Sequence, residues 1–288
     1  MRIAHFSDIH AFVHDFQATA FFDKRLLGTF NHFFRRSKDH HWDRVHNGVA
    51  KIKCMEPDIV IFTGDLATLS SPKEFDLACQ ALKPLVEDTS FEFLIVPGNH
   101  DFYVHSQKCI DALEKSIYYL SRNRWKLYDF PMKFPYMKCE FFLLNQANPA
   151  PPWASNGYLD AQSISFVENE LENNSDNIKV LVSHYPLYDQ SGMELNWRRK
   201  CKGNDILLNA FDHEFFRLAL CGHIHSPFVR PLTAKACEIC AGSLNFNGVF
   251  NFMDLNILDG SLNQQWIFLD ETGKGNQQTS TVQNLVNN

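Results

Sequence analysis

The sequence lacks the features that would place the protein across a membrane or in an oxidising compartment. No run of about 18 consecutive apolar residues occurs, so we expect no transmembrane helix. The opening residues, MRIAHFSDIH, carry no apolar stretch behind a basic start, so we predict no signal peptide. Eight cysteines are scattered through 288 residues, and the only close pair is Cys237 and Cys240. Because this CxxC lies in a strand-like run, we interpret the cysteines as reduced structural thiols of a cytoplasmic protein.

The sequence also lacks the surplus of basic residues that long nucleic acids require. It contains 27 Lys and Arg residues against 33 Asp and Glu residues, which gives a net charge of −6. Domains that follow a DNA or RNA backbone usually carry a strong positive balance, so this class of partner is excluded. A small phosphorylated substrate is compatible with the composition, because bound metal or a local cation can hold it.

Apolar runs alternate with helical patterns along the chain, which is typical of α/β proteins. Buried strands are predicted over residues 2–7, 58–63, 91–96, 140–145, 178–183 and 217–221. Helices are predicted over residues 42–55, 106–121 and 160–173, the last with Asp160 as its N-cap. After residue 230 the pattern turns to strands, and we expect these to complete a second sheet. We predict a single domain over residues 1–272 and a disordered tail over residues 273–288.

Residues 11–41 form an insertion that is unusually rich in aromatic and basic side chains. Its apolar residues recur at about helical spacing: Phe21, Phe22, Leu26, Leu27, Phe30, Phe33 and Phe34. One interpretation is a helical insertion that packs on the core. The other is an amphipathic segment that contacts an acyl chain or the inner face of a membrane, with Arg25 binding a substrate phosphate.

Polar residues follow five of the predicted strands directly. They are Asp8 and His10, Gly64 and Asp65, Gly98 to Asp101, His184, and Gly222 to His225. The C-terminal ends of strands are where open α/β sheets bind ligands. Carboxylate oxygens, an amide oxygen and imidazole nitrogens together suit divalent Mn, Fe, Zn or Ni.

Seven candidate ligands are too many for one ion that keeps open positions, but they suffice for two divalent ions if one carboxylate bridges. A pair of ions can clamp a phosphate and activate water. Each short motif is weak by itself, although GNHD is expected by chance in only about one chain in a thousand of this length. The prediction rests on the ordered combination of motifs, each placed behind a strand.

Taken in order, these motifs resemble those of the calcineurin-like metallophosphoesterases, which carry D-x-H, G-D, G-N-H-[DE], a lone H and G-H-x-H. The resemblance implies an α/β fold in which two mixed β-sheets form a sandwich flanked by helices. It implies a first metal held by Asp8, His10, Asp65 and His225, and a second held by Asp65, Asn99, His184 and His223. His100 would face the substrate and protonate the leaving group, with Asp101 orienting it. The glycine at position 222 would allow close approach and an unusual backbone angle.

The resemblance implies a hydrolase of phosphodiester or pyrophosphate bonds and leaves the substrate open. The insertion beside Asp8 and His10 resembles bacterial enzymes that cleave UDP-diacylglucosamine, so a lipid-linked nucleotide is our first hypothesis. A soluble cyclic-nucleotide phosphodiesterase is the second, and a non-catalytic metal-binding scaffold is an alternative of another class. In NWRRKCK, Arg198 and Arg199 are candidates for binding a second phosphate, against the alternative of a solvated loop. Nothing in the sequence predicts the oligomeric state.

Overall fold

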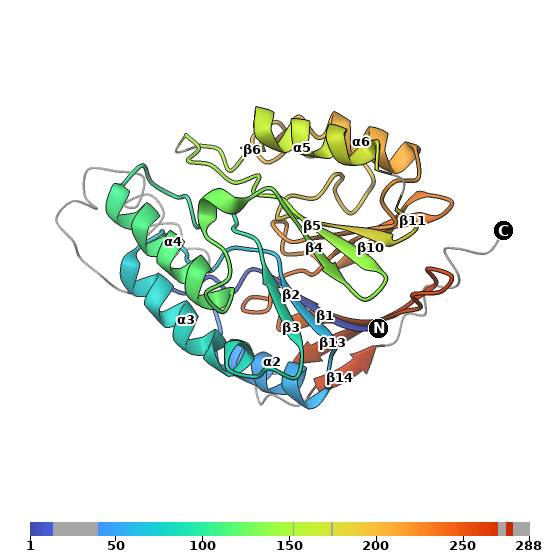
Figure 1. The fold of residues 1–288 in the computed structure, drawn as a ribbon. Coiled ribbons are helices and arrows are strands. Elements are labelled where there is room, and N and C mark those ends of the chain that lie inside the picture. The colour runs from blue at the N-terminus through green and yellow to red at the C-terminus, as the bar shows by residue number, and fades with distance from the viewer. Residues whose placement is uncertain (14–39, 152, 174, 270–274, 279–288) are drawn as a thin grey trace.

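The computed structural model describes residues 1–13, 40–151, 153–173, 175–269 and 275–278. These residues form two six-stranded mixed sheets with helices on the outside (Figure 1). A small sheet of β6 (Gly157–Tyr158) and β8 (Cys201–Lys202) ties together two loops. The predicted two-sheet α/β sandwich is therefore confirmed.

The first sheet combines the N-terminal strands with the last strands of the chain, in the order β14-β13-β12-β1-β2-β3. Strands β1, β2 and β3 run parallel, whereas β12 pairs with β1 antiparallel. The bounds are β1 (Arg2–Phe6), β2 (Ile59–Phe62), β3 (Glu92–Ile95), β12 (Val249–Leu255), β13 (Leu262–Leu269) and β14 (Gly275–Gln278). The expectation that the late strands complete a second sheet was wrong for β12 and β13, because β12 covers the free edge of β1. Strand β14 falls within residues 273–288, the tail for which disorder is predicted, and residues 279–288 lie outside the described part of the chain.

The second sheet has the order β10-β11-β9-β7-β5-β4. Its inner strands β11, β9, β7 and β5 run parallel, and β10 and β4 add antiparallel edges. The bounds are β4 (Met132–Tyr136), β5 (Cys139–Leu143), β7 (Ile178–Val182), β9 (Leu218–Cys221), β10 (Phe228–Thr233) and β11 (Ala236–Cys240). Parallel inner strands bring their C-terminal ends to one edge of each sheet, where the polar motifs begin.

Helices cover the outer faces of both sheets. In Figure 1, α2, α3 and α4 lie beside the first sheet, and α5 and α6 lie beside the second. The bounds are α2 (Trp42–Cys54), α3 (Pro72–Val86), α4 (Gln107–Leu120), α5 (Ala161–Leu171) and α6 (Asp205–Asp212). The predicted cap is confirmed, since the Asp160 carboxylate accepts the Ser163 backbone N–H at 2.8 Å. None of the described helices combines the length and apolar character that a bilayer-spanning helix requires.

Phenylalanine, of which the chain has 26, supplies much of the packing between sheet and helices. Phe142 of β5 packs against Phe166 of α5 and against Phe215 and Phe216, with ring centroids 5.2–5.9 Å apart. Burying one such ring stabilises the fold by about 1.5–3 kcal/mol, and favourable ring geometry adds to this. This packing holds β5, which pairs with β7, the strand that ends just before His184.

Candidate metal centre

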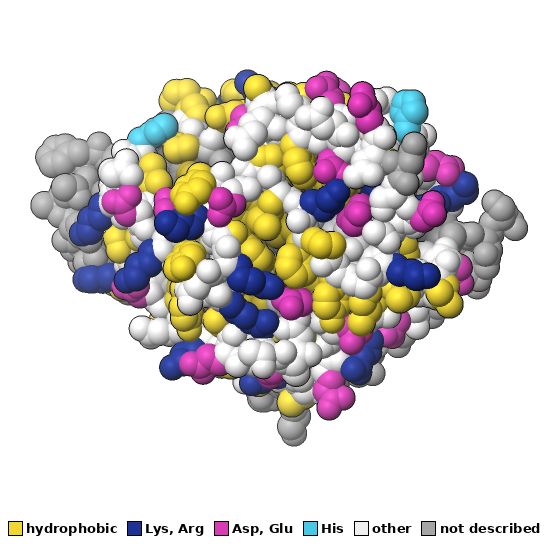
Figure 2. All heavy atoms as spheres, in the orientation of Figure 1, with side chains coloured by type: hydrophobic (Ala, Val, Ile, Leu, Met, Phe, Trp, Pro, Cys, Tyr) yellow, Lys and Arg dark blue, Asp and Glu magenta, His cyan; other side chains and the backbone are white. Residues whose placement is uncertain are grey.

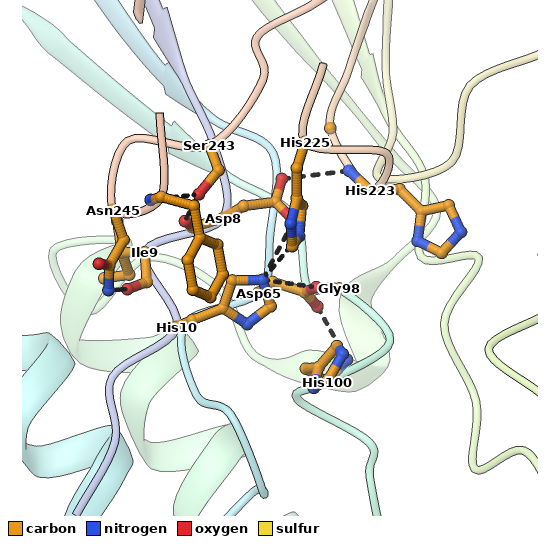
Figure 3. Close-up of polar contacts among 12 residues, drawn as sticks. Asp8, Ile9, His10, Asp65, Gly98, His100, His223, His225, Ser243 and Asn245 are labelled. Carbon is orange, nitrogen blue, oxygen red and sulfur yellow. Dashed lines mark hydrogen bonds and ion pairs between the residues drawn. The ribbon is translucent and has the colours of Figure 1, made fainter. Parts of the chain in front are cut away.

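Four predicted ligands converge where β1, β2 and β9 end. Figure 3 shows Asp8, His10, Asp65 and His225 pointing toward one another, and one ligand atom from each lies within 4.8 Å of the others. His10 Nε2 lies 2.9 Å from His225 Nε2, and Asp8 Oδ1 lies 3.1 Å from His225 Nε2. Two imidazole nitrogens that face each other beside buried carboxylates form a donor set suited to a cation.

Asp65 lies between this cluster and a second group of predicted ligands. Its Oδ2 atom is 3.6 Å from His10 Nε2 on one side and 3.5 Å from His184 Nε2 on the other. Asn99 completes the second group, because its Oδ1 atom lies 3.0 Å from His184 Nε2 and 2.8 Å from His223 Nδ1. The structure thus brings together all seven predicted ligand residues, with one Asp65 oxygen close to both groups.

Backbone carbonyl groups orient two histidines of the second group. His184 Nδ1 lies 2.6 Å from the carbonyl oxygen of Thr63, and His223 Nε2 lies 3.0 Å from that of Arg199. A carbonyl oxygen can only accept a hydrogen bond, so the ring nitrogen that faces it must carry a proton. The other nitrogen of each ring faces Asn99. Such outer contacts fix the tautomer that a metal ligand needs.

Burial and neighbouring charges favour the cation-binding protonation states of His10, His223 and Asp65, whereas they favour the protonated form of His184. Burial lowers the pKa of His10 and of His223, which favours their neutral forms. Burial alone would raise the pKa of Asp65, but the neighbouring His184 and His100 have a larger opposite effect. The net result is a pKa below the usual value, so the carboxylate stays ionised. For His184, burial lowers the pKa and Asp65 raises it, with a result of about 9. A divalent cation bound beside Asp65 would compete with that proton.

Five of the ligand residues adopt left-handed backbone angles that side chains usually avoid. The φ angles are 56° for Asp8, 45° for His10, 62° for Asp65, 71° for His223 and 55° for His225. Each such residue costs about 1–3 kcal/mol and persists only where surrounding contacts enforce it. The concentration of this strain at one place is typical of a functional site.

Gly222 permits close approach but does not carry the unusual angle that we predicted for it. A Cβ atom there would overlap Ser7 Oγ and would lie 2.5 Å from Asp8 Oδ2. The left-handed angles instead fall on His223 and His225, which follow it. The glycine is therefore needed for space, since β9 and β1 meet at this point.

His100 lies beside the first group, with its ring 4.8 Å from the ring of His10. Its Nδ1 atom lies 2.7 Å from the carbonyl oxygen of Thr68, and its backbone N–H donates to Asp65 Oδ1 at 2.8 Å. The ring of Tyr103 stacks on it at 5.3 Å. Thr68 therefore sets the orientation of the imidazole, and Nε2 is the nitrogen that can exchange a proton with a substrate.

Asp101 has a different role from the predicted one. Its carboxylate accepts the backbone N–H groups of Gly98 at 2.9 Å, Asp65 at 3.1 Å and Ala67 at 3.0 Å. These bonds join the loop after β3 to the loop after β2. Asp101 holds the shape of the loops that carry Asp65 and His100, whereas the orientation of the His100 ring comes from a backbone carbonyl.

The sequence analysis missed the loop after β11, whose side chains hold the backbone of the Asp8–His10 segment. Ser243 Oγ donates to the Asp8 carbonyl at 2.7 Å, and Asn245 Nδ2 donates to the Ile9 carbonyl at 2.6 Å (Figure 3). The ring of Phe246 lies 5.2 Å from that of His10 and 5.1 Å from that of His225. Ser243 and Asn245 follow a strand end, so the pattern that found the ligands could have found this loop.

The three arginines predicted to bind substrate are not brought together in the described part of the chain as the metal ligands are. Arg25 lies outside the described residues. Arg199 contacts the site through its backbone carbonyl, while the guanidinium of Arg198 lies over the exposed ring of Trp197 at 5.1 Å. Both flanks of the insertion do reach the site, because Ala11 bridges to Ala67 and His40 Nε2 lies 2.9 Å from the His10 carbonyl oxygen.

The two-sheet sandwich brings carboxylate, amide and imidazole side chains together in a donor set suited to divalent cations. A family model described as calcineurin-like phosphoesterase matches residues 1–227. The chain belongs to this family.

Two curated relatives match part of the chain at low sequence identity. A 3′,5′-cyclic-nucleotide phosphodiesterase from Nostoc sp. is 27% identical over 177 residues, which is 61% of this chain and 58% of that protein. A "Probable glycerophosphodiester phosphodiesterase GpdQ" from Arcobacter nitrofigilis is 24% identical over 173 residues, 59% of this chain and 57% of that protein. The matched region therefore spans less than two thirds of either relative.

Solved structures share the fold at low sequence identity. A dimetal phosphatase from Danio rerio superposes with a TM-score of 0.65 at 15% identity, covering 98% of both chains. The purple acid phosphatase PPD1 from yellow lupin superposes with a TM-score of 0.57 at 12% identity, covering all of this chain and 55% of that one.

Proposed function

We propose that the protein is a metal-dependent phosphodiesterase that hydrolyses small phosphodiesters at a centre of two divalent cations. The observation that carries this proposal is the position of Asp65 Oδ2, within 3.6 Å of a histidine nitrogen in each of the two ligand groups. The described residues fit such ions, because buried carboxylates, an amide oxygen and imidazole nitrogens converge there.

The first ion would be held by Asp8, His10, Asp65 and His225, and the second by Asp65, Asn99, His184 and His223. Bound cations would supply activated water and neutralise charge on the phosphate. His100 contributes the chain's own proton chemistry. With Nδ1 held by the Thr68 carbonyl, its Nε2 can give a proton to the leaving oxygen.

The names of the two relatives support a phosphodiester as the substrate class, with a cyclic nucleotide as the leading candidate. Our first hypothesis, a lipid-linked nucleotide, was based on residues 11–41. Of these, residues 14–39 lie outside the described part of the chain. The lipid-linked nucleotide is therefore included as one of the substrates in the test.

The test measures turnover by the Mn²⁺-loaded protein on bis(p-nitrophenyl) phosphate, cyclic AMP, glycerophosphoethanolamine and UDP-diacylglucosamine in detergent micelles. We expect hydrolysis of the diesters, and a loss of about 10²–10⁴-fold in kcat on His100→Ala with metal content retained. Asn99→Ala should lose both turnover and metal at the second group. His213→Ala, on an exposed side chain after α6, is the matched control and should be unchanged.

A metal-loaded protein that turns over none of these esters would refute the proposal and favour the non-catalytic scaffold. Full activity in both His100→Ala and Asn99→Ala would refute the assigned site. Preference for UDP-diacylglucosamine over cyclic AMP would replace the cyclic nucleotide with the lipid-linked substrate.

A further inference from the structure

Two loops beside the metal centre expose large hydrophobic side chains to solvent. We call these four residues the aromatic rim: Trp153, Tyr158, Met193 and Trp197. Their exposed fractions are 64%, 47%, 66% and 58% respectively. Half of the eight large hydrophobic side chains exposed in the described part of the chain therefore belong to these loops. Figure 2 shows hydrophobic side chains at the upper left surface, over the loops around β6 in Figure 1.

Backbone hydrogen bonds join the two loops into one structural unit. The Ser155 N–H donates to the Arg198 carbonyl at 2.8 Å. Ser155 lies two residues after Trp153, and Arg198 directly follows Trp197. Tyr158 of β6 pairs with Lys202 of β8. These bonds hold the loop of Trp153 and Tyr158 against the segment that carries Trp197. Exposed Trp side chains placed together in this way usually mark a surface that binds a partner.

The charges around the rim favour an anionic partner, although the whole chain is acidic. Arg198, Arg199 and Lys202 are exposed, and none forms an ion pair with another residue of the described part. Lys200 pairs with Glu194 at 3.0 Å. The exposed Asp189 carboxylate accepts the backbone N–H groups of Ser191 and Met193 within its own loop.

We propose that the aromatic rim docks the protein onto the surface of an anionic lipid bilayer. Trp and Tyr rings are favoured at the interface of a bilayer, where the ring contacts acyl chains and its polar edge meets headgroups. Unpaired Arg and Lys beside them bind anionic headgroups.

Docking through this rim would set the metal centre at the level of the headgroups. The carbonyl of Arg199, two residues after Trp197, accepts the hydrogen bond from the ring of His223. The aromatic rim and the second ligand group are thus connected through one loop, which carries both Trp197 and Arg199. The inference uses only described residues and does not depend on residues 14–39.

The test is co-sedimentation of the full-length protein with vesicles of phosphatidylcholine, with and without phosphatidylglycerol, at low and high salt. We expect binding to the anionic vesicles that weakens as salt rises. The Trp153→Ser/Trp197→Ser double variant should bind at least about tenfold more weakly. Lys202→Gln should bind about fivefold more weakly. Thermal unfolding followed by circular dichroism should show the variants folded.

The matched control is Tyr128→Ser/Leu258→Ser, which removes side chains that are 66% and 81% exposed elsewhere. Its vesicle binding should equal that of the unmodified protein. The proposal is overturned if the unmodified protein ignores anionic vesicles, or if the control pair loses as much binding as the Trp pair. It also fails if Phe33→Ser/Phe34→Ser abolishes binding and the Trp pair does not, or if the rim binds RNA in preference to vesicles. Sedimentation requires no turnover, so this result is independent of the proposed activity.

Discussion

At the scale of single residues, backbone carbonyls control the histidines of the centre. Thr63, Thr68 and Arg199 each present a carbonyl oxygen to one ring nitrogen of His184, His100 and His223 respectively. Each contact decides which nitrogen faces the site. Because every residue type has a carbonyl group, no sequence pattern could have predicted these three partners.

Asp101 provides a test of how the loops around His100 are held. Asp101→Asn places an amide N–H₂ among three backbone donors, so at least one donor loses its acceptor. We expect the free energy of unfolding to fall by about 2–4 kcal/mol, measured by urea denaturation, and metal content to fall with it. Asp111→Asn, on an exposed carboxylate of α4, is the control. Unchanged stability with a loss of kcat equal to that of His100→Ala would restore the catalytic role first predicted for Asp101.

At the scale of elements, the parallel strands were well predicted and the supporting structure was not. The ends of β1, β2, β3, β7 and β9 deliver the ligands, because continuous apolar runs followed by polar residues show where buried strands stop. Helix α3 was missed, although Ser71 and Glu74 form a capping box around Pro72. The placement of β12 and β13 in the first sheet could not be predicted, since strand pairing depends on contacts distant in sequence.

Gly222 tests whether the close approach of β9 to β1 sets the position of Asp8. In Gly222→Ala the new methyl group would overlap Ser7 Oγ and push against the Asp8 carboxylate. We expect weaker metal binding by at least tenfold, measured by titration with Mn²⁺ and calorimetry. Gly260→Ala, where the nearest atom to a Cβ is 3.9 Å away, should bind Mn²⁺ normally despite its left-handed angle. Normal metal affinity in Gly222→Ala would show that the site tolerates separation of the strands.

At the scale of the whole molecule, the centre is an interface between two sheets. The first sheet supplies Asp8, Asp65 and Asn99, and the second supplies His184 and His223. Glu238 of β11 supports this interface from the core, where its carboxyl group accepts the Leu187 backbone N–H at 2.6 Å just after His184. Because the ligands come from both sheets, a change that loosens the packing between the sheets should also displace the ligands from one another.

Glu238 should make the stability of the molecule depend on pH. Burial raises its pKa from 4.5 to about 7, so the folded state holds the proton more tightly than the unfolded chain. The stabilisation of the folded state that comes from protonated Glu238 is fully present below pH 4.5 and is lost as the pH rises through 7. Urea denaturation should show a decline of up to about 3 kcal/mol across this interval. In Glu238→Gln the decline should be smaller, and an unchanged pH profile would contradict this assignment.

We propose as the central claim that one Asp65 oxygen would serve two cations, and anomalous diffraction at the manganese edge tests this proposal most directly. Crystals of the Mn²⁺-loaded protein should show two peaks about 3.5–4 Å apart on either side of the Asp65 carboxylate. One peak should lie against His10 and His225, and the other against His184 and His223. A single peak, or two peaks that do not share Asp65, would contradict the account.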